Sequence, residues 1–177
     1  MKPQQTIEAF DQFLFENGKV FSAIIIGGGA LALMGVISRE TQDIDVLEPA
    51  LSDEIINLSQ AFASAYSQTT LKKNWLNNGP QSLQQDLPNG WMQRTSVIFT
   101  GKAFSLSTLG RSDLLKTKLF AFCDREQDRQ DCIFMKPTKD ELQEAFVWLQ
   151  QRDQNPEWPN HVKLSLQSLA KDLGYEF

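Results

Sequence analysis

The sequence predicts a mixed α/β (α+β) fold in which helices pack on a small β-sheet and the C-terminal part is helical. Three observations support this fold class. Two short runs rich in β-branched residues, "VFSAIII" and "DIDVL", flank a glycine-rich segment with the composition of a short helix. A later stretch, "RTSVIFTGKAFSL", has the pattern of a β-hairpin. Apolar residues then recur at helical spacing to the end of the chain.

The first expected element is a helix that Thr6 caps and Gly18 ends. Its apolar residues follow helical spacing: Ile7, Phe10, Leu14 and Phe15. A buried strand over 20–26, a turn made by three glycines, a short helix over 30–38 and a second strand over 43–47 come next. Because a helix separates the two strands, the sequence predicts a βαβ unit with parallel strands.

The middle of the chain is expected to hold a helix, a long loop and the hairpin. Ser52 caps the helix, which extends to about Tyr66. The segment 69–90 is rich in Asn, Gln, Gly and Pro and predicts a long loop. The hairpin after it is expected to turn near Thr100 and Gly101.

The remainder of the chain is predicted to be helical. Ser112 opens a helix with one apolar face: Leu114, Leu115, Leu119 and Phe122. Another helix is expected over 125–135, Thr138 and Glu141 form a capping box for the next, and the last ends at Gly174. We assign residues 1–135 to the main domain and 136–177 to C-terminal helices packed on that same domain.

Composition excludes several classes of protein. A net charge of −5 argues against indiscriminate nucleic-acid binding, which needs a strongly basic face. Cys123, Cys132 and His161 are too few and too scattered for a typical zinc site. The charged N-terminus does not resemble a signal peptide, so a reduced, cytoplasmic protein is expected. The uncharged run 20–37 approaches the length of a membrane span, but its three central glycines favour a strand, a turn and a helix instead.

Two carboxylates end this glycine-rich unit. Asp43 and Asp45 are two positions apart on the second strand, so their side chains project to the same face. Carboxylates about 6–7 Å apart repel each other unless a cation lies between them. Mg²⁺ binds one or two carboxylates and completes its shell with water and substrate phosphates. We therefore expect Asp43 and Asp45 to be metal ligands, against the simpler interpretation of a solvated pair.

The glycines fit the same site. A turn at Gly27 and Gly28 without side chains lets a phosphate approach the backbone, and the helix after it offers unpaired N–H groups. A triphosphate on the glycines with its metal on the aspartates is an arrangement suited to phosphoryl transfer. Close packing of the helix is the structural alternative for the glycines.

A dinucleotide-binding fingerprint is a further alternative. Gly27, Gly29 and Ala32 match the pattern G-x-G-x-x-A. Glu48 lies 19 residues after Gly29, and in this fingerprint an acidic residue about 20 positions further on binds the ribose of the dinucleotide. This Rossmann-like interpretation leaves Asp43 and Asp45 without a role. It also needs more βαβ units than the chain supplies.

The motifs resemble those of the nucleotidyltransferase superfamily, which includes DNA polymerase beta. Ile26-Gly27-Gly28 matches its hydrophobic-Gly-Gly element, and Asp43-Ile44-Asp45 matches its Asp-x-Asp element. The longer text "GGGALALMGVISRETQDIDVL" is similar to bacterial abortive-infection toxins of type IV toxin–antitoxin systems and to a related, poorly characterised nucleotidyltransferase-like group. The resemblance covers about residues 20–135 and implies a nucleotidyltransferase-like fold.

The resemblance implies a role for each matched residue. Asp43 and Asp45 would be catalytic and hold Mg²⁺, and Gly27 and Gly28 would bind the nucleotide. Lys118 matches a lysine that faces the nucleotide in the toxins, the alternative being a solvated helix lysine.

A second element of the resemblance lies near residue 130. Asp128 and Asp131 match a K-D-x-x-D element in which Gln127 replaces the lysine.

One departure separates two functional hypotheses. The superfamily often has a third carboxylate on a later strand, but "RTSVIF" offers none, Asn74 lies where relatives carry Asp, and Asp86 is the nearest remaining acid. The first hypothesis is a Mg²⁺-dependent enzyme that moves an NMP from a nucleoside triphosphate to an acceptor (RNA, protein or small molecule). The second is a catalytically degenerate module that binds a nucleotide or a partner such as an antitoxin.

In the enzyme hypothesis the acceptor enters over the segment 69–90. That loop is expected to be the most mobile part of the free protein. Trp75 and Trp91 lie near its ends, and either one lines the cleft or both fill the edge of the core.

Overall fold

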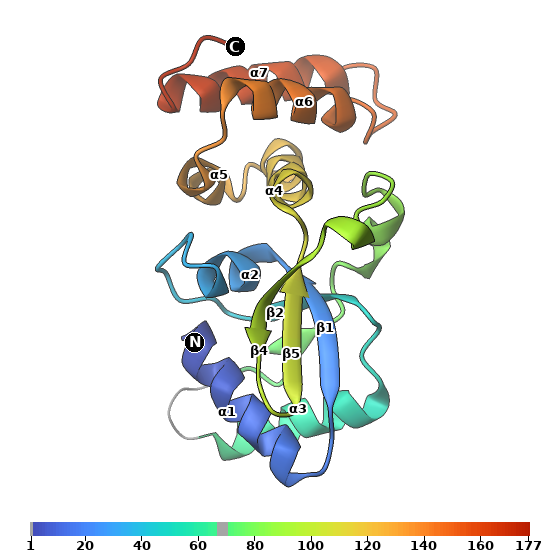
Figure 1. Ribbon diagram of the computed structural model, residues 1–177. Coiled ribbons are helices and arrows are strands. Elements are labelled where there is room, and N and C mark those ends of the chain that lie inside the picture. The colour runs from blue at the N-terminus through green and yellow to red at the C-terminus, as the bar shows by residue number, and fades with distance from the viewer. Residues whose placement is uncertain (1, 67–70) are drawn as a thin grey trace. The chain divides into compact units, whose positions relative to one another are not determined.

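The computed structural model describes residues 2–66 and 71–177 (Figure 1). The chain divides into two compact units, Met1–Gly110 and Arg111–Phe177. The sequence placed a boundary between 135 and 136, whereas the compact units divide after Gly110. No described helix is long and apolar enough to cross a membrane.

The first unit contains a five-stranded sheet and three helices among its described residues. The helices are α1 (Pro3–Glu16), α2 (Gly27–Leu33) and α3 (Asp53–Ala65). The strands are β1 (Phe21–Ile26), β2 (Ile44–Glu48), β3 (Leu76–Asn77), β4 (Ser96–Thr100) and β5 (Phe104–Thr108). Two 3₁₀ turns, η1 (Gln81–Gln85) and η2 (Met92–Arg94), lie between β3 and β4.

The sheet is mixed, with the strand order β3-β2-β1-β5-β4. β1 pairs in parallel with β5, and β2 in parallel with β3. β4 and β5 form the expected antiparallel hairpin, whose turn covers residues 101–103, directly after Thr100. The predicted fold class, a small mixed sheet with helices, is confirmed.

The predicted parallel βαβ unit is wrong, because β1 and β2 pair antiparallel. The link between the two strands, residues 27–43, exceeds the dozen or so residues that a parallel crossover needs, so its length does not set the direction of β2. α2 takes up only seven residues of this link, and the parallel neighbour of β1 is instead β5, on its other edge. The Rossmann-like interpretation, which requires β1 and β2 to be parallel, is also wrong.

Three predicted boundaries move. α1 begins at Pro3, so Thr6 lies inside the helix, where its hydroxyl donates to the Lys2 carbonyl at 3.0 Å. α2 begins at Gly27, so the three glycines are its first turn, and it ends at Leu33. The described part of the predicted loop, residues 71–90, contains β3 and η1, while residues 69 and 70 lie outside the described part.

Aromatic rings from distant parts of the chain form the core of the first unit. Phe10 of α1 lies 5.1 Å from Trp75, 5.2 Å from Phe62 and 5.3 Å from Phe104, measured between ring centroids. Trp75 is fully buried, and its indole N–H donates to the Ser59 carbonyl at 3.0 Å. Trp91 is also buried, so neither tryptophan presents an open ring for stacking, and the interpretation as core residues holds.

A buried carboxylate joins α1 to the hairpin. Asp11 Oδ1 accepts from the backbone N–H groups of Ala103 and Phe104, both at 2.7 Å, and Oδ2 accepts from that of Lys102 at 3.0 Å. A side chain at Gly101 would collide with this carboxylate. Burial alone would raise the pKa of Asp11, but the three backbone donors outweigh it and hold the pKa below its usual value.

The second unit is helical, with α4 (Arg111–Arg125), α5 (Arg129–Met135), α6 (Lys139–Leu149) and α7 (Trp158–Asp172). The expected apolar face of α4 is buried throughout. The capping box of Thr138 and Glu141 is present, and α7 ends just before Gly174, which has φ +81°. These local predictions are confirmed.

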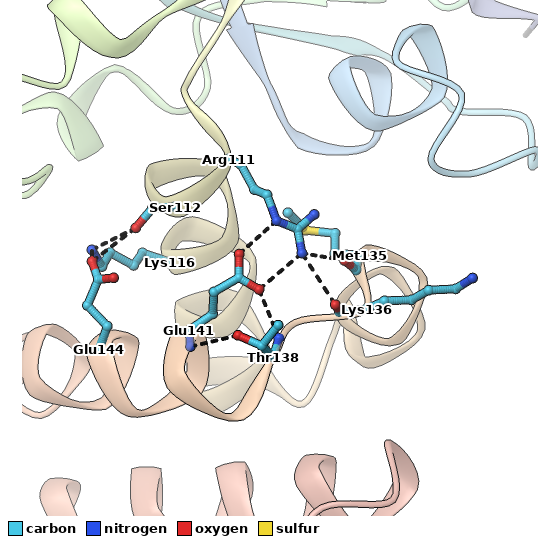
Figure 2. A network of polar contacts seen from close by, with 8 residues as sticks. All are labelled: Arg111, Ser112, Lys116, Met135, Lys136, Thr138, Glu141 and Glu144. Atoms are coloured by element: carbon cyan, nitrogen blue, oxygen red, sulfur yellow. Dashed lines mark hydrogen bonds and ion pairs between the residues drawn. The ribbon is translucent and has the colours of Figure 1, made fainter.

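A polar network ties the start of α4 to α6 (Figure 2). The Arg111 guanidinium donates to both Glu141 oxygens, at 2.7 and 3.1 Å, and to the Met135 carbonyl at 2.8 Å. Beside it, Lys116 lies 2.6 Å from Glu144. The hydrogen bond from Arg111 lowers the pKa of Glu141, and that from Lys116 lowers the pKa of Glu144.

We expect Asp11→Asn to lower the free energy of unfolding by about 2–3 kcal/mol, because an amide N–H would then face the Lys102 N–H. A folded-state pKa below the unfolded one stabilises the protein fully above about pH 5, and this contribution disappears as the pH falls through the lowered pKa. Urea unfolding should therefore show that the wild type exceeds Asp11→Asn in free energy of unfolding by less at pH 3 than at pH 7. Glu8→Gln, an exposed change on the same helix, should have an effect within about 0.5 kcal/mol.

We expect Glu141→Gln to lower the free energy of unfolding by about 1 kcal/mol at pH 7, since the pair with Arg111 is partly exposed. The folded-state pKa of Glu141 is lowered, so the difference from the wild type should be complete above about pH 5 and fade as the pH falls through the lowered pKa. Thermal unfolding at several pH values measures it. A difference that stays constant with pH would mean that the charge of Glu141 does not stabilise the unit.

Candidate functional site

The two aspartates and the glycine-rich turn meet at one end of β2. Asp43 immediately precedes β2, Asp45 is its second residue, and both are half-buried. Asp45 lies opposite Ile26, the last residue of β1, in the antiparallel register. Since Gly27 follows Ile26 directly, the sequence-predicted Gly27 and Asp45 become neighbours.

Gly27 and Gly29 allow this close approach. Gly27 has φ +78°, and a Cβ there would lie 2.6 Å from Asp45 Oδ2. A Cβ at Gly29 would lie 2.6 Å from Ile44 Cδ1 and 3.2 Å from the Asp43 carbonyl oxygen. Glycine at 27 therefore leaves space beside the carboxylate, whereas glycine at 29 serves the packing of α2 on β2.

Gly28 has a different environment. A Cβ there would lie 3.3 and 3.7 Å from the two terminal nitrogens of the exposed Arg39 and 3.5 Å from the Thr41 methyl group. A guanidinium group thus lies beside the predicted phosphate-binding glycine. Arg39 was not predicted from the sequence, in which its only signal is a basic residue four positions before Asp43.

Asn77 is a second residue that the sequence argument missed. It lies on β3 in register with Asp45, and its Nδ2 donates to Asp45 Oδ1 at 3.1 Å. Asn74 and Asp86, which the sequence argument named, are both exposed. The side chain that flanks Asp45 on the neighbouring strand is therefore an amide from Asn77.

The described residues include no group of three or more His, Cys, Asp or Glu side chains placed to hold a metal ion. The sequence-predicted ligands at this end of β2, Asp43 and Asp45, contribute two carboxylates. Cys123 and Cys132 are buried in the second unit, where burial raises the pKa of each thiol to about 12. Both thiols therefore remain protonated at neutral pH.

Lys118 belongs to the helical unit and is buried, so the alternative of a solvated helix lysine is wrong. Its ammonium group lies 2.9 Å from Asp131 and 3.2 Å from Asp128, the two acids of the predicted motif. Asp131 is also buried, while Asp128 is partly exposed and has φ +64°. The structure thus brings these three residues together, and a contact between Lys118 and a nucleotide stays a prediction.

Comparisons with known proteins agree with the geometry. A family model described as nucleotidyltransferase of unknown function (DUF6036) matches residues 4–136. The match includes both aspartates, all three glycines and Lys118. No curated protein matches the chain.

One similar solved structure is that of an antigenic nucleotidyltransferase-like protein from Paracoccidioides brasiliensis. It is 20% identical, covers 92% of each chain and has a TM-score of 0.45. Since the family model spans well over half of the sequence, the chain belongs to this family of nucleotidyltransferases of unknown function.

Proposed function

We propose that this protein is a Mg²⁺-dependent nucleotidyltransferase that moves a nucleoside monophosphate from a nucleoside triphosphate to an acceptor. One observation carries the proposal: Asp45 Oδ2 lies at a glycine where any side chain would collide with it. The neighbouring Asp43 supplies a second carboxylate, and the neighbouring Gly28 supplies a half-buried stretch of backbone without a side chain.

The donor set suits a hard divalent cation. Asp43 and Asp45 would hold Mg²⁺, which prefers carboxylate oxygens and retains water and phosphate ligands. When bound, the ion would neutralise charge on the triphosphate. A Cβ at Gly27 would fill the space next to Asp45, so the glycine keeps that carboxylate accessible from the turn.

The remaining residues would orient the substrate. Gly28 lets a phosphate oxygen reach the backbone, and Arg39 beside it offers a fork of N–H donors that matches phosphate geometry. In the transfer itself, the acceptor hydroxyl oxygen forms a bond to the α-phosphorus and the α–β phosphoanhydride bond breaks. Pyrophosphate leaves, and the hydroxyl proton passes to solvent.

A second candidate is a module that binds the nucleotide without transferring it. The observation that favours it is Asn77: the side chain that the neighbouring strand places beside Asp45 is an amide, which does not act as a general base as a carboxylate can. Incubation with Mg²⁺, each labelled triphosphate and a set of acceptors (RNA, cell extract with or without an antitoxin-like partner, and the protein itself) separates the two. Label transfer that Asp45→Asn abolishes supports the enzyme, whereas nucleotide binding without transfer supports the module.

We expect Asp43→Asn and Asp45→Asn each to weaken Mg²⁺-dependent nucleotide binding by at least 10-fold, since each removes a charged oxygen ligand. Both variants should keep the wild-type circular dichroism spectrum, because both side chains lie at the surface end of a strand. Titration calorimetry with Mg²⁺ and a non-hydrolysable triphosphate measures the loss. Asp86→Asn, an exposed carboxylate in the same unit, is the matched control, and unchanged affinity in both site variants would refute the metal site.

We expect Gly28→Val and Gly29→Ala to separate binding from stability. Gly28 does not have a positive φ, so valine should fill the space beside Arg39 and weaken nucleotide binding with little loss of stability, and Gly28→Ala should be milder. Gly29→Ala should lower the free energy of unfolding by about 1–3 kcal/mol through overpacking against Ile44. Titration calorimetry measures nucleotide binding by the variants, and thermal unfolding measures their stability. If Gly28→Val binds the nucleotide normally, the glycines serve only the packing of the helix.

A further inference from the structure

We infer that Asn77 is a positioning residue that orients Asp45 and limits this site to a single divalent ion. The inference rests on the proposed function, because it concerns the same carboxylates. It goes further in naming the residue that sets the metal stoichiometry. The contacts of the Asn77 amide, all within the first unit, support it.

The orientation of the Asn77 amide follows from its neighbours. Nδ2 lies 3.1 Å from Asp45 Oδ1 and 3.4 Å from the Ile44 carbonyl oxygen, which both accept hydrogen bonds. Oδ1 accepts from the Gly79 N–H at 2.7 Å. A flipped amide would put its oxygen against two acceptors and its N–H against a donor, so only one orientation is compatible with the site.

A second glycine maintains this arrangement. A Cβ at Gly79 would lie 2.7 Å from Asn77 Oδ1 and 4.0 Å from Asp45 Oδ1. Glycines therefore stand on both sides of Asp45, Gly27 next to Oδ2 and Gly79 next to the amide that binds Oδ1. The turn after β3 is built closely around the Asn77 side chain.

These contacts fix the direction of Asp45. Its Oδ1 is held by Asn77, and its Oδ2 consequently lies at Gly27 on the glycine turn. Partners that orient a ligating carboxylate are worth about 10–100-fold in metal affinity. Removing the amide should therefore weaken cation binding even though Asn77 is not itself a ligand.

The contacts of the Asn77 amide also leave a second ion without an oxygen ligand from Asn77 beside Asp45. Sites with two metals about 3.5–4 Å apart need carboxylate oxygens for both ions. Asn77 directs an N–H group, which repels a cation, at Asp45 Oδ1, and its oxygen points to the Gly79 N–H instead of to Asp45. An aspartate at position 77 would replace that N–H with an oxygen and complete a second site.

The test counts bound Mn²⁺ by electron paramagnetic resonance, with and without a non-hydrolysable triphosphate. We expect one Mn²⁺ per wild-type chain with the analogue and a second in Asn77→Asp. Asn74→Asp adds the same charge to an exposed position of the same segment and should behave as the wild type. Asn77→Ala should keep one Mn²⁺ with affinity reduced about 10-fold or more.

Each outcome decides between the claims. Two ions in the wild type, or an Asn77→Asp variant that matches Asn74→Asp, would overturn the single-ion inference while leaving the proposed function intact. Wild-type Mn²⁺ affinity in Asn77→Ala would overturn the positioning role. Should Asn77→Asp fail to fold, the count of Mn²⁺ in the wild type still tests the single-ion inference, and Asn77→Ala still tests the positioning role. A wild-type chain whose Mn²⁺ binding does not exceed that of Asp45→Asn would overturn the proposed function itself.

Discussion

The contact between the first turn of α2 and β2 is the constraint on which the rest of the site depends. Without side chains at Gly27 and Gly29, the helix backbone rests almost directly on the strand. This closeness explains why three glycines form a helical turn despite their poor helix propensity, about 1 kcal/mol each relative to alanine. The antiparallel register of β1 and β2 adds to this closeness, because it brings Asp45 opposite Ile26, the residue before Gly27.

Signals within a few residues of one another were sufficient to predict most of the elements. The Ser52 cap, the Thr138–Glu141 capping box and the β4–β5 hairpin all depend on neighbouring residues. Strand direction is not such a local signal: the link of residues 27–43 is long enough for either direction, and only the pairing shows that β2 is antiparallel to β1 while the distant β5 is parallel to it. β3 has two residues, too few for any periodic pattern, and it exists only through its pairing with β2.

The site was predictable to the same extent. The sequence alone shows that Asp43 and Asp45 have i, i+2 spacing and that residue 27 has no side chain. The structure places these residues together. Asn77 was hidden, because several asparagines stand close together in that segment and composition cannot tell which one faces Asp45. Only the register of β2 and β3, with partners 32 positions apart, distinguishes it. Arg39 could not be predicted for a similar reason. Nothing in the sequence distinguishes it from other exposed arginines, and only the fold places it beside Gly28.

The central position of β1 has a consequence for how the first unit folds. β1 is among the earliest segments of the chain, yet one of its edges pairs with β5, whose residues lie 83 positions later. Asp11 of α1 likewise holds backbone groups 91 to 93 positions away. Such contacts give the unit a high contact order. The chain loses the entropy of closing a long loop before strand pairing can stabilise it, and this cost slows folding. During synthesis the β4–β5 hairpin must leave the ribosome before β5 can pair with β1. Until then β1 has an unpaired edge, and the strand is rich in β-branched residues.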